Sequence, residues 1–232
     1  AAATGCEYLL VDAGWRSERW GWLKDGGDVW ARAAELVRYG AERGVGIVYM
    51  AGLASVIADA GTLVDFVEVE PQQHWLRGRG RDDRFRLDGP VFDAIKALGK
   101  PCILHSVGCP LGGTDSTLDE QADALRASIE RLDPAWVSEH LSFNRFTHGG
   151  AQHHANFLLP PLPCAASRDI AVQRIDALRA ALAKPIAFEN GVNYLRPLAG
   201  EWSDGRFVRE VAEHADCAIL LDLHNAWTNS RN

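Results

Sequence analysis

The chain has 232 residues, of which 47% are hydrophobic and 24% charged, which is enough to bury one sizeable core. Its formal net charge is −7 and its 24 Lys and Arg residues are scattered, which argues against a nucleic-acid-binding surface, because phosphate binding needs clustered basic side chains. No apolar run approaches the roughly 18 residues that a membrane span needs, and the N-terminus lacks the pattern of a signal peptide. These features predict a soluble protein.

Cysteine usage indicates the cellular compartment. The five cysteines are odd in number and form no Cys-x-x-Cys pair, which fits a reducing environment better than a disulfide framework. We therefore expect a cytoplasmic protein. Because the first residue is Ala1 and no initiator Met is present, we also expect a fragment of a longer chain or an engineered one.

Strand-like and helix-like segments alternate along the chain. Strands are expected over residues 7–12, 45–50, 64–69, 101–105, 135–141, 185–190 and 217–224. Helices are expected over residues 29–43, 53–59, 90–98, 116–132, 168–183 and 204–214, and Gly44, Gly99 and a capping box at 116–119 mark some of their ends. The segments 72–88 and 142–167 are expected to be irregular.

This alternation predicts an α/β fold in which parallel strands are joined by right-handed crossovers. Polar residues at the carboxyl ends of several strands favour a TIM-type (β/α) barrel, whose loops converge on one face. The barrel would be incomplete, with about seven parallel strands in one domain over residues 1–232. A doubly wound open sheet is the alternative, but it would gather its ligands at one switch point.

The ends of four predicted strands carry side chains that bind metals. These candidates are His105, Glu139 with His140, Glu189 with Asn190, and Asp222 with His224 and Asn225. In an extended strand, residues two apart point to the same face, so Asp222 and His224 would form half of a metal site. A mixture of imidazole and carboxylate suits iron, although zinc or manganese stays open as an alternative.

Five motifs in one order carry a resemblance to a known family. They are His105-Ser-Val-Gly108, Trp136-Val-Ser-Glu-His-Leu141, Asn156 with Leu158-Leu-Pro160, Phe188-Glu-Asn190 and Leu220-Leu-Asp-Leu-His-Asn225. In order and spacing, the segment from about residue 45 to 232 resembles the multinuclear non-haem iron-dependent oxidative enzymes, formerly a domain of unknown function with a TIM-type barrel.

The resemblance implies a site of two or three iron ions that activates dioxygen and oxidises cysteine in a precursor peptide, often delivered by a partner protein. Carried over position by position, the implied metal ligands are His105, Glu139, Glu189, Asp222 and His224. Weaker ligands, or residues that orient the ligands, are His74, His140, His154, Asn156, Asn190 and Asn225.

The sequence departs from the family pattern in three places. Residues 71–74 read Pro-Gln-Gln-His, so a carboxamide stands where a carboxylate is expected and His74 is the substitute. Phe157 stands where an acidic residue usually precedes Leu-Leu-Pro. The chain ends before the last two strands of the family, which supply further ligands, so an incomplete metal site is expected.

Residues 1–48 resemble something else, namely a βα unit of glycoside hydrolase family 97, and a chimera of two barrel pieces would join near residues 45–48. Two other functions therefore stay open. One is a metal-dependent hydrolase or isomerase that acts on a sugar or a phosphate ester. The other is an inactive fragment or scaffold, whose open barrel edge could lead to self-association.

Overall fold

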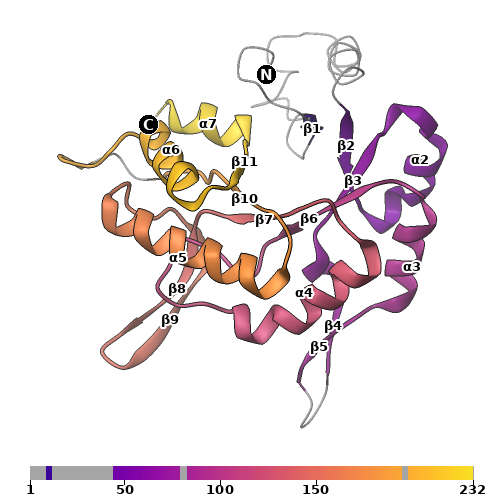
Figure 1. The fold of residues 1–232 in the computed structure, drawn as a ribbon, viewed down its shortest axis with the longest axis horizontal. Coiled ribbons are helices and arrows are strands. Elements are labelled where there is room, and N and C mark those ends of the chain that lie inside the picture. Colours follow the sequence, from indigo (N-terminus) through magenta and orange to yellow (C-terminus); the bar gives the residue numbers. More distant parts are fainter. Residues whose placement is uncertain (1–8, 12–43, 79–82, 195–197, 232) are drawn as a thin grey trace. The chain divides into compact units, whose positions relative to one another are not determined.

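The computed structural model describes residues 9–11, 44–78, 83–194 and 198–231 (Figure 1). The chain forms two compact units. The first comprises Ala1–Glu70 and Gly89–Ile103, and the second comprises Pro71–Asp88 and Leu104–Asn232. The predicted helix over residues 29–43 lies outside the described residues, so it stays a prediction, as do the single domain and the seam near residues 45–48.

Three parallel strands organise the first unit. Strand β1 (Leu9–Val11) pairs with β2 (Val45–Val48), which pairs with β3 (Phe66–Val69). Opposite Phe66, a Cβ atom at Gly46 would come within 2.1 Å of the Phe66 ring, so only glycine fits there. The helices of this unit are α2 (Ala54–Asp59), between the short 3₁₀ helices η1 (Ala51–Leu53) and η2 (Gly61–Leu63), and α3 (Gly89–Ala97).

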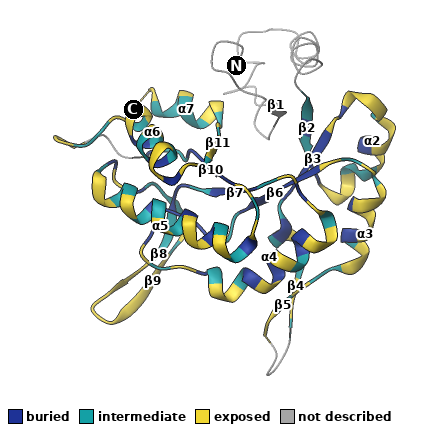
Figure 2. Cartoon of the chain, viewed as in Figure 1, coloured by how far each residue is buried: buried dark blue, intermediate teal, exposed yellow. Residues whose placement is uncertain are grey.

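Four strands run parallel in the second unit. They pair in the order β6 (Cys102–Ser106), β7 (Val137–His140), β10 (Ile186–Glu189) and β11 (Ala218–Leu220), although β6 begins in the first unit. Every residue of β6 and β10 is buried (Figure 2). Strands buried on both faces are typical of parallel α/β sheets.

Amphipathic helices connect these strands. They are α4 (Leu118–Leu132), α5 (Ala165–Leu182) and α6 (Asp204–Ala215), and α7 (Leu223–Asn229) follows β11. Helix α4 buries Ala122, Leu125 and Ile129, which recur at helical spacing and form one apolar face. Figure 1 shows α4 and α5 side by side along the strands, and α5 also packs against α6. None of the helices in the described part of the chain has the length and apolar character that crossing a membrane requires.

The predicted fold class is confirmed. The structure describes three parallel strands in the first unit and four in the second, alternating with helices, as expected of an incomplete TIM-type barrel with about seven parallel strands.

Both segments that were predicted to be irregular contain hairpins instead. The first holds the 3₁₀ helix η3 (Pro71–His74), followed by the antiparallel pair β4 (Trp75–Arg77) and β5 (Phe85–Leu87). The second holds β8 (Phe143–His148) and β9 (Ala151–Leu159). Gly149 and Gly150 join β8 to β9 with φ values of 59° and 78°, and such positive values at both loop residues match a tight hairpin turn.

The predicted strand over residues 217–224 is wrong at its carboxyl end. Strand β11 ends at Leu220, and Asp222 is the N-cap of helix α7, where its side chain accepts a hydrogen bond of 2.8 Å from the Asn225 N–H. This bond satisfies one of the N–H groups in the first turn of α7, which have no partner within the helix. The period-two argument that placed Asp222 and His224 on one strand face therefore fails.

Candidate metal centre

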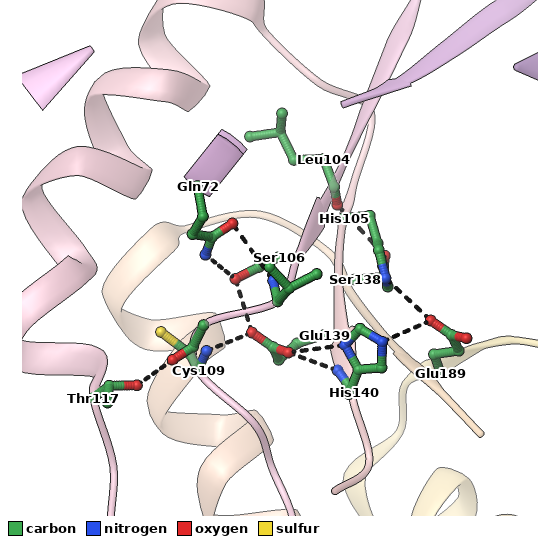
Figure 3. A network of polar contacts seen from close by, with 12 residues as sticks. Gln72, Leu104, His105, Ser106, Cys109, Thr117, Ser138, Glu139, His140 and Glu189 are labelled. Atoms are coloured by element: carbon green, nitrogen blue, oxygen red, sulfur yellow. Dashed lines mark hydrogen bonds and ion pairs between the residues drawn. The ribbon is translucent and has the colours of Figure 1, made fainter. Parts of the chain in front are cut away.

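Three side chains from neighbouring parallel strands of the second unit converge. His105 lies in β6, His140 ends β7 and Glu189 ends β10, and one ligand atom of each lies within 4.8 Å of the others (Figure 3). Glu189 Oε2 is 3.1 Å from His105 Nε2 and 3.4 Å from His140 Nε2. In the described part of the chain, these three form the group that could hold a metal ion.

The strand register explains this convergence. His105 stands opposite Ser138 across the pair formed by β6 and β7, and His140 stands opposite Glu189 across the pair formed by β7 and β10. Since parallel strands end at the same edge of their sheet, their last side chains meet there. The imidazole rings of His105 and His140 lie 4.7 Å apart between centroids.

Each imidazole is oriented by a second contact. His105 Nδ1 lies 2.8 Å from Ser138 Oγ, which directs His105 Nε2 towards Glu189. His140 Nδ1 lies 3.4 Å from Glu139 Oε1, and His140 Nε2 faces Glu189. A partner on one ring nitrogen leaves the other nitrogen to face a cation, which is how proteins orient histidine ligands.

Glu139 is fully buried, and donors of the chain surround its carboxylate. Its Oε2 atom accepts hydrogen bonds from Ser106 Oγ at 2.8 Å and from the Cys109 N–H at 2.6 Å, and Oε1 accepts one from the His140 N–H at 2.8 Å. Gln72 Nε2 donates in turn to Ser106 Oγ at 2.7 Å. The structure thus places Glu139 beside the group of three, next to His140.

Two carboxyl groups influence each other at the edge of this group. Burial opposes the ionisation of Glu189, but the hydrogen bond to His105 and the charges of His140 and His105 outweigh it, so the pKa of Glu189 lies below its usual value. The pKa of Asp222 is raised, mainly by burial and further by the charge of Glu189. Glu189 is therefore held as a carboxylate, and Asp222 is close enough to feel its charge.

The predicted amide side chains link β10 to the start of α7. Asn190 Nδ2 donates to the Asp222 carbonyl at 3.0 Å, and Asn190 Oδ1 accepts from the Asp222 N–H at 2.7 Å. Asn225 Nδ2 donates to the Asn190 carbonyl at 2.9 Å and reaches Glu189 Oε1 at 3.4 Å. Both amides thus position the segment that carries Asp222.

Other predicted site residues lie elsewhere in the second unit. His224 is exposed in the first turn of α7, and its ring centroid is 6.3 Å from that of Trp227. His154 and Asn156 are exposed on β9, where Asn156 has a φ of 60°, and His74 ends η3 with its carbonyl accepting from the Asp88 N–H. None of them belongs to the group of His105, His140 and Glu189.

The sequence interpretation underrated His140 and missed two serines. We placed His140 among the weaker ligand candidates, yet its ring reaches Glu189 from the last position of β7. Ser106 and Ser138 were not recognised as partners of Glu139 and His105. Aligning the two strand-end motifs in register would have found them, since His105 pairs with Ser138 and Ser106 with Glu139.

Similarity to solved structures supports the fold. The carboxyl transferase domain of Rhizobium etli pyruvate carboxylase with 3-bromopyruvate aligns with a TM-score of 0.50 at 14% identity, over 92% of this chain and 32% of that one. A sugar phosphate isomerase/epimerase from Parabacteroides distasonis aligns with a TM-score of 0.48 at 11% identity, over 80% of this chain and 67% of that one. At 14% identity, the alignment with the carboxyl transferase domain shows the fold alone.

Sequence similarity identifies the family. A UPF0276 protein of Anaeromyxobacter sp. (strain Fw109-5) is 36% identical to this chain, over 72% of this chain and 58% of the relative. A UPF0276 protein of Acinetobacter baylyi is 30% identical, over 82% of this chain and 61% of the relative. The chain thus spans about three fifths of the length of these relatives. The family described as RiPP precursor modification enzyme MbnB/TglH/ChrH matches residues 44–232, which confirms the resemblance seen in the motifs. The chain belongs to this family.

Proposed function

We propose that the chain is the metal-binding part of an enzyme that uses two or three iron ions and dioxygen to oxidise cysteine in a peptide. The observation that carries this proposal is the convergence of His105, His140 and Glu189 from neighbouring strands. The family description supports a precursor peptide as the substrate. A partner protein that delivers the peptide, and a location in the cytoplasm, are further parts of the proposal.

The donor set fits iron. Two imidazole nitrogens and one carboxylate oxygen within 4.8 Å of one another provide the mixed ligands that non-haem iron prefers. Burial and the charge of Glu189 both raise the pKa of Asp222, and a cation bound beside these two groups would favour the ionised form of both. Glu139, Asp222 and His224 are the proposed ligands of further ions, with Asn156, Asn190 and Asn225 as amide ligands or orienting groups.

The residues of the chain have separate roles in this proposal. Iron supplies one-electron and dioxygen chemistry when bound. Ser138 and Glu139 fix the rings of His105 and His140, and the buried strand ends limit the access of water. Glu189, whose pKa lies below its usual value, presents a negatively charged oxygen towards the two imidazoles.

Metal analysis tests the proposal. Protein that is purified without oxygen and reconstituted with Fe(II) is expected to retain iron, and we expect His105→Ala, His140→Ala and Glu189→Gln each to lower its iron affinity at least about tenfold. The matched control is His153→Ala, because His153 is exposed on β9 and stacks on Phe146. Unchanged iron content in all three variants would show that these residues do not form a metal site.

The retained metal also separates the candidate chemistries. Iron with a visible absorption band that changes on exposure to air supports the oxidative enzyme. Retention of zinc or manganese alone would indicate a hydrolase or isomerase instead. Absence of any retained metal would favour an inactive fragment.

A further inference from the structure

A series of polar side chains leads from helix α4 to the candidate metal centre. It begins at Gln121 in α4 and continues through Gln72 in η3 and Ser106 in β6, and all three residues belong to the second unit. We call these three residues the amide relay. Figure 3 shows its inner end, where Ser106 meets Glu139 beside His140. The amide relay therefore ends next to one of the imidazoles that could hold a metal.

The outer end of the amide relay has a fixed polarity. The Gly108 carbonyl oxygen can only accept hydrogen bonds, and Gln121 Nε2 donates to it at 3.0 Å. Gln121 therefore turns its Oε1 atom towards Gln72, and Gln72 Nε2 donates to this atom at 3.1 Å. Gln72 Oε1 accepts in turn from the Val107 N–H at 3.4 Å. Each carboxamide thus has one orientation that satisfies its neighbours.

This polarity decides where the single proton of the Ser106 hydroxyl points. Gln72 Nε2 also donates to Ser106 Oγ, at 2.7 Å. Because a hydroxyl carries one proton and this oxygen already faces an N–H group, the proton is directed to its other neighbour, Glu139 Oε2, at 2.8 Å. The Ser106 side chain is buried, so bulk water does not compete for the proton.

The Ser106 hydrogen bond determines which Glu139 oxygen faces His140. Glu139 Oε2 accepts from Ser106 Oγ and from the Cys109 N–H, which leaves Oε1 to face His140. Oε1 accepts from the His140 N–H at 2.8 Å and lies 3.4 Å from His140 Nδ1. Because a carboxylate oxygen accepts, this contact keeps the proton of a neutral imidazole on Nδ1 and leaves the Nε2 lone pair for a cation.

Gly108 shows that the place of the Gln121 side chain is reserved. A Cβ atom on Gly108 would overlap the end of that side chain, and its distance to Gln121 Nε2 would be 2.6 Å. Gly108 does not have a positive φ, so its backbone conformation alone does not require glycine. Gly108→Ala would therefore displace the first carboxamide of the amide relay without removing any of its hydrogen-bonding groups.

We propose that Gln72 is a positioning residue of the metal centre, which together with Gln121 commits the Ser106 proton to Glu139 and thereby fixes the tautomer and the direction of His140. The proposal rests on the proposed function, in which His140 faces a metal. It goes further by giving a role to Gln72 and Gln121, neither of which belongs to the group that could hold a metal.

Metal affinity tests the role of Gln72. The probe is Co(II), whose visible absorption bands report its binding to imidazole and carboxylate ligands. Gln72→Met removes the donated hydrogen bonds at nearly constant size, and Gln72→Glu places an acceptor where a donor is needed. We expect Gln72→Met to weaken Co(II) binding about three- to tenfold, and Gln72→Glu to weaken it at least as much. The matched control is Gln173→Met, because Gln173 is exposed in α5.

Combined substitutions show whether Gln72 acts through Ser106. Ser106→Ala removes the hydroxyl that donates to Glu139, so it should weaken Co(II) binding at least as much as Gln72→Met does. Adding Gln72→Met to Ser106→Ala should then cause no further loss, because the path to Glu139 is already interrupted. Gly108→Ala should likewise lower the affinity of the parent protein but not that of Gln121→Met.

The tautomer of His140 gives a readout that needs no metal. It is read from the imidazole ¹⁵N signals of the metal-free protein at a pH of about 9, well above the usual range of histidine, and His140→Gln identifies these signals. We expect the Nδ1–H tautomer in the parent protein. In Gln72→Glu we expect a mixture of both tautomers, because the new carboxylate takes the Ser106 proton and Glu139 loses a donor that holds it towards His140. A merely structural role of Gln72 would lower thermal stability and leave the tautomer unchanged.

Three results would overturn the proposal. They are an Nε2–H tautomer of His140 in the parent protein, unchanged Co(II) affinity in both Gln72 variants, and additive losses when Gln72→Met is combined with Ser106→Ala. A parent protein that binds neither iron nor Co(II) would contradict the proposed function instead. The tautomer of the metal-free protein would still decide whether the amide relay positions His140.

Discussion

Glu139 shows how one buried charge depends on the donors around it. Its carboxylate accepts hydrogen bonds from Ser106 Oγ and from the N–H groups of Cys109 and His140. Glu139→Gln would turn an amide NH₂ towards one of these donors, so we expect the free energy of unfolding of the metal-free protein to fall by about 2–4 kcal/mol. Urea unfolding followed by circular dichroism measures this loss. Glu130 is exposed in α4, so Glu130→Gln should change the free energy of unfolding little. Equal losses of stability in Glu139→Gln and Glu130→Gln would show that the hydrogen bonds to Glu139 do not stabilise the fold.

The Cys109 thiol predicts a specific dependence of stability on alkaline pH. Burial, and then the charge of Glu139, raises the pKa of Cys109 to about 12. The unfolded chain loses this proton near the ordinary thiol value, so between about pH 9 and 12 the folded state binds more protons and stability falls as pH rises.

The expected loss from Cys109 approaches about 4 kcal/mol by pH 12, because each tenfold difference in acidity is worth about 1.4 kcal/mol. The free energy of unfolding of Cys109→Ala, measured in urea from pH 8 to 11, should therefore fall less steeply than that of the parent. Cys217, whose pKa is raised to about 11, contributes to the decline in both proteins. If the free energy of unfolding of both proteins fell equally steeply with pH, Cys109 would not be the cause of the decline.

At the scale of elements, Asn190 fastens the start of α7 to the end of β10. Its side chain both donates to and accepts from the backbone of Asp222. Asn190→Ala leaves those two backbone groups without their partner, which should cost about 2–4 kcal/mol and make the segment around Asp222 more accessible to protease. Limited proteolysis with mass spectrometry measures the accessibility. Asn144→Ala in β8 is the matched control, since Asn144 Oδ1 has no hydrogen-bond partner among the described residues.

Sequence periodicity located the buried strands well and the hairpins poorly. β3, β6 and β10 each begin with an apolar run and are buried at every residue, so they were predicted within two residues of their ends. β8 and β9 are largely exposed on both faces, so no alternating pattern marks them. The Asp222 segment was misread as strand because an apolar run preceded it, whereas its side chain caps a helix.

The candidate site was predictable in residue type but not in detail. Strand-end position identified His105 and Glu189, because parallel strands bring their ends together. Which of Glu139 and His140 joins His105 and Glu189 depends on the register of β7 and on the donors around Glu139. These contacts join residues far apart in the sequence, so no local sequence pattern marks them.

At the scale of the whole molecule, we expect copies of the chain to pair through the outer edge of β11. In the described part of the chain β11 pairs with β10 and with no other strand. Apolar residues are exposed on β11 and on the helix that follows it, since Ile219 in β11 is 41% exposed and Trp227 in α7 is 46% exposed. A free strand edge with exposed apolar side chains is a template for pairing with another chain.

We therefore expect this chain to self-associate at tens of micromolar, and Ile219→Lys to reduce that association because a charge on an edge strand opposes pairing. Sedimentation velocity over a concentration series measures the effect. Val56→Lys is the matched control, since Val56 is 56% exposed on α2 rather than on a strand edge. A monomeric parent protein, or equal association of both variants, would show that the β11 edge does not join two copies.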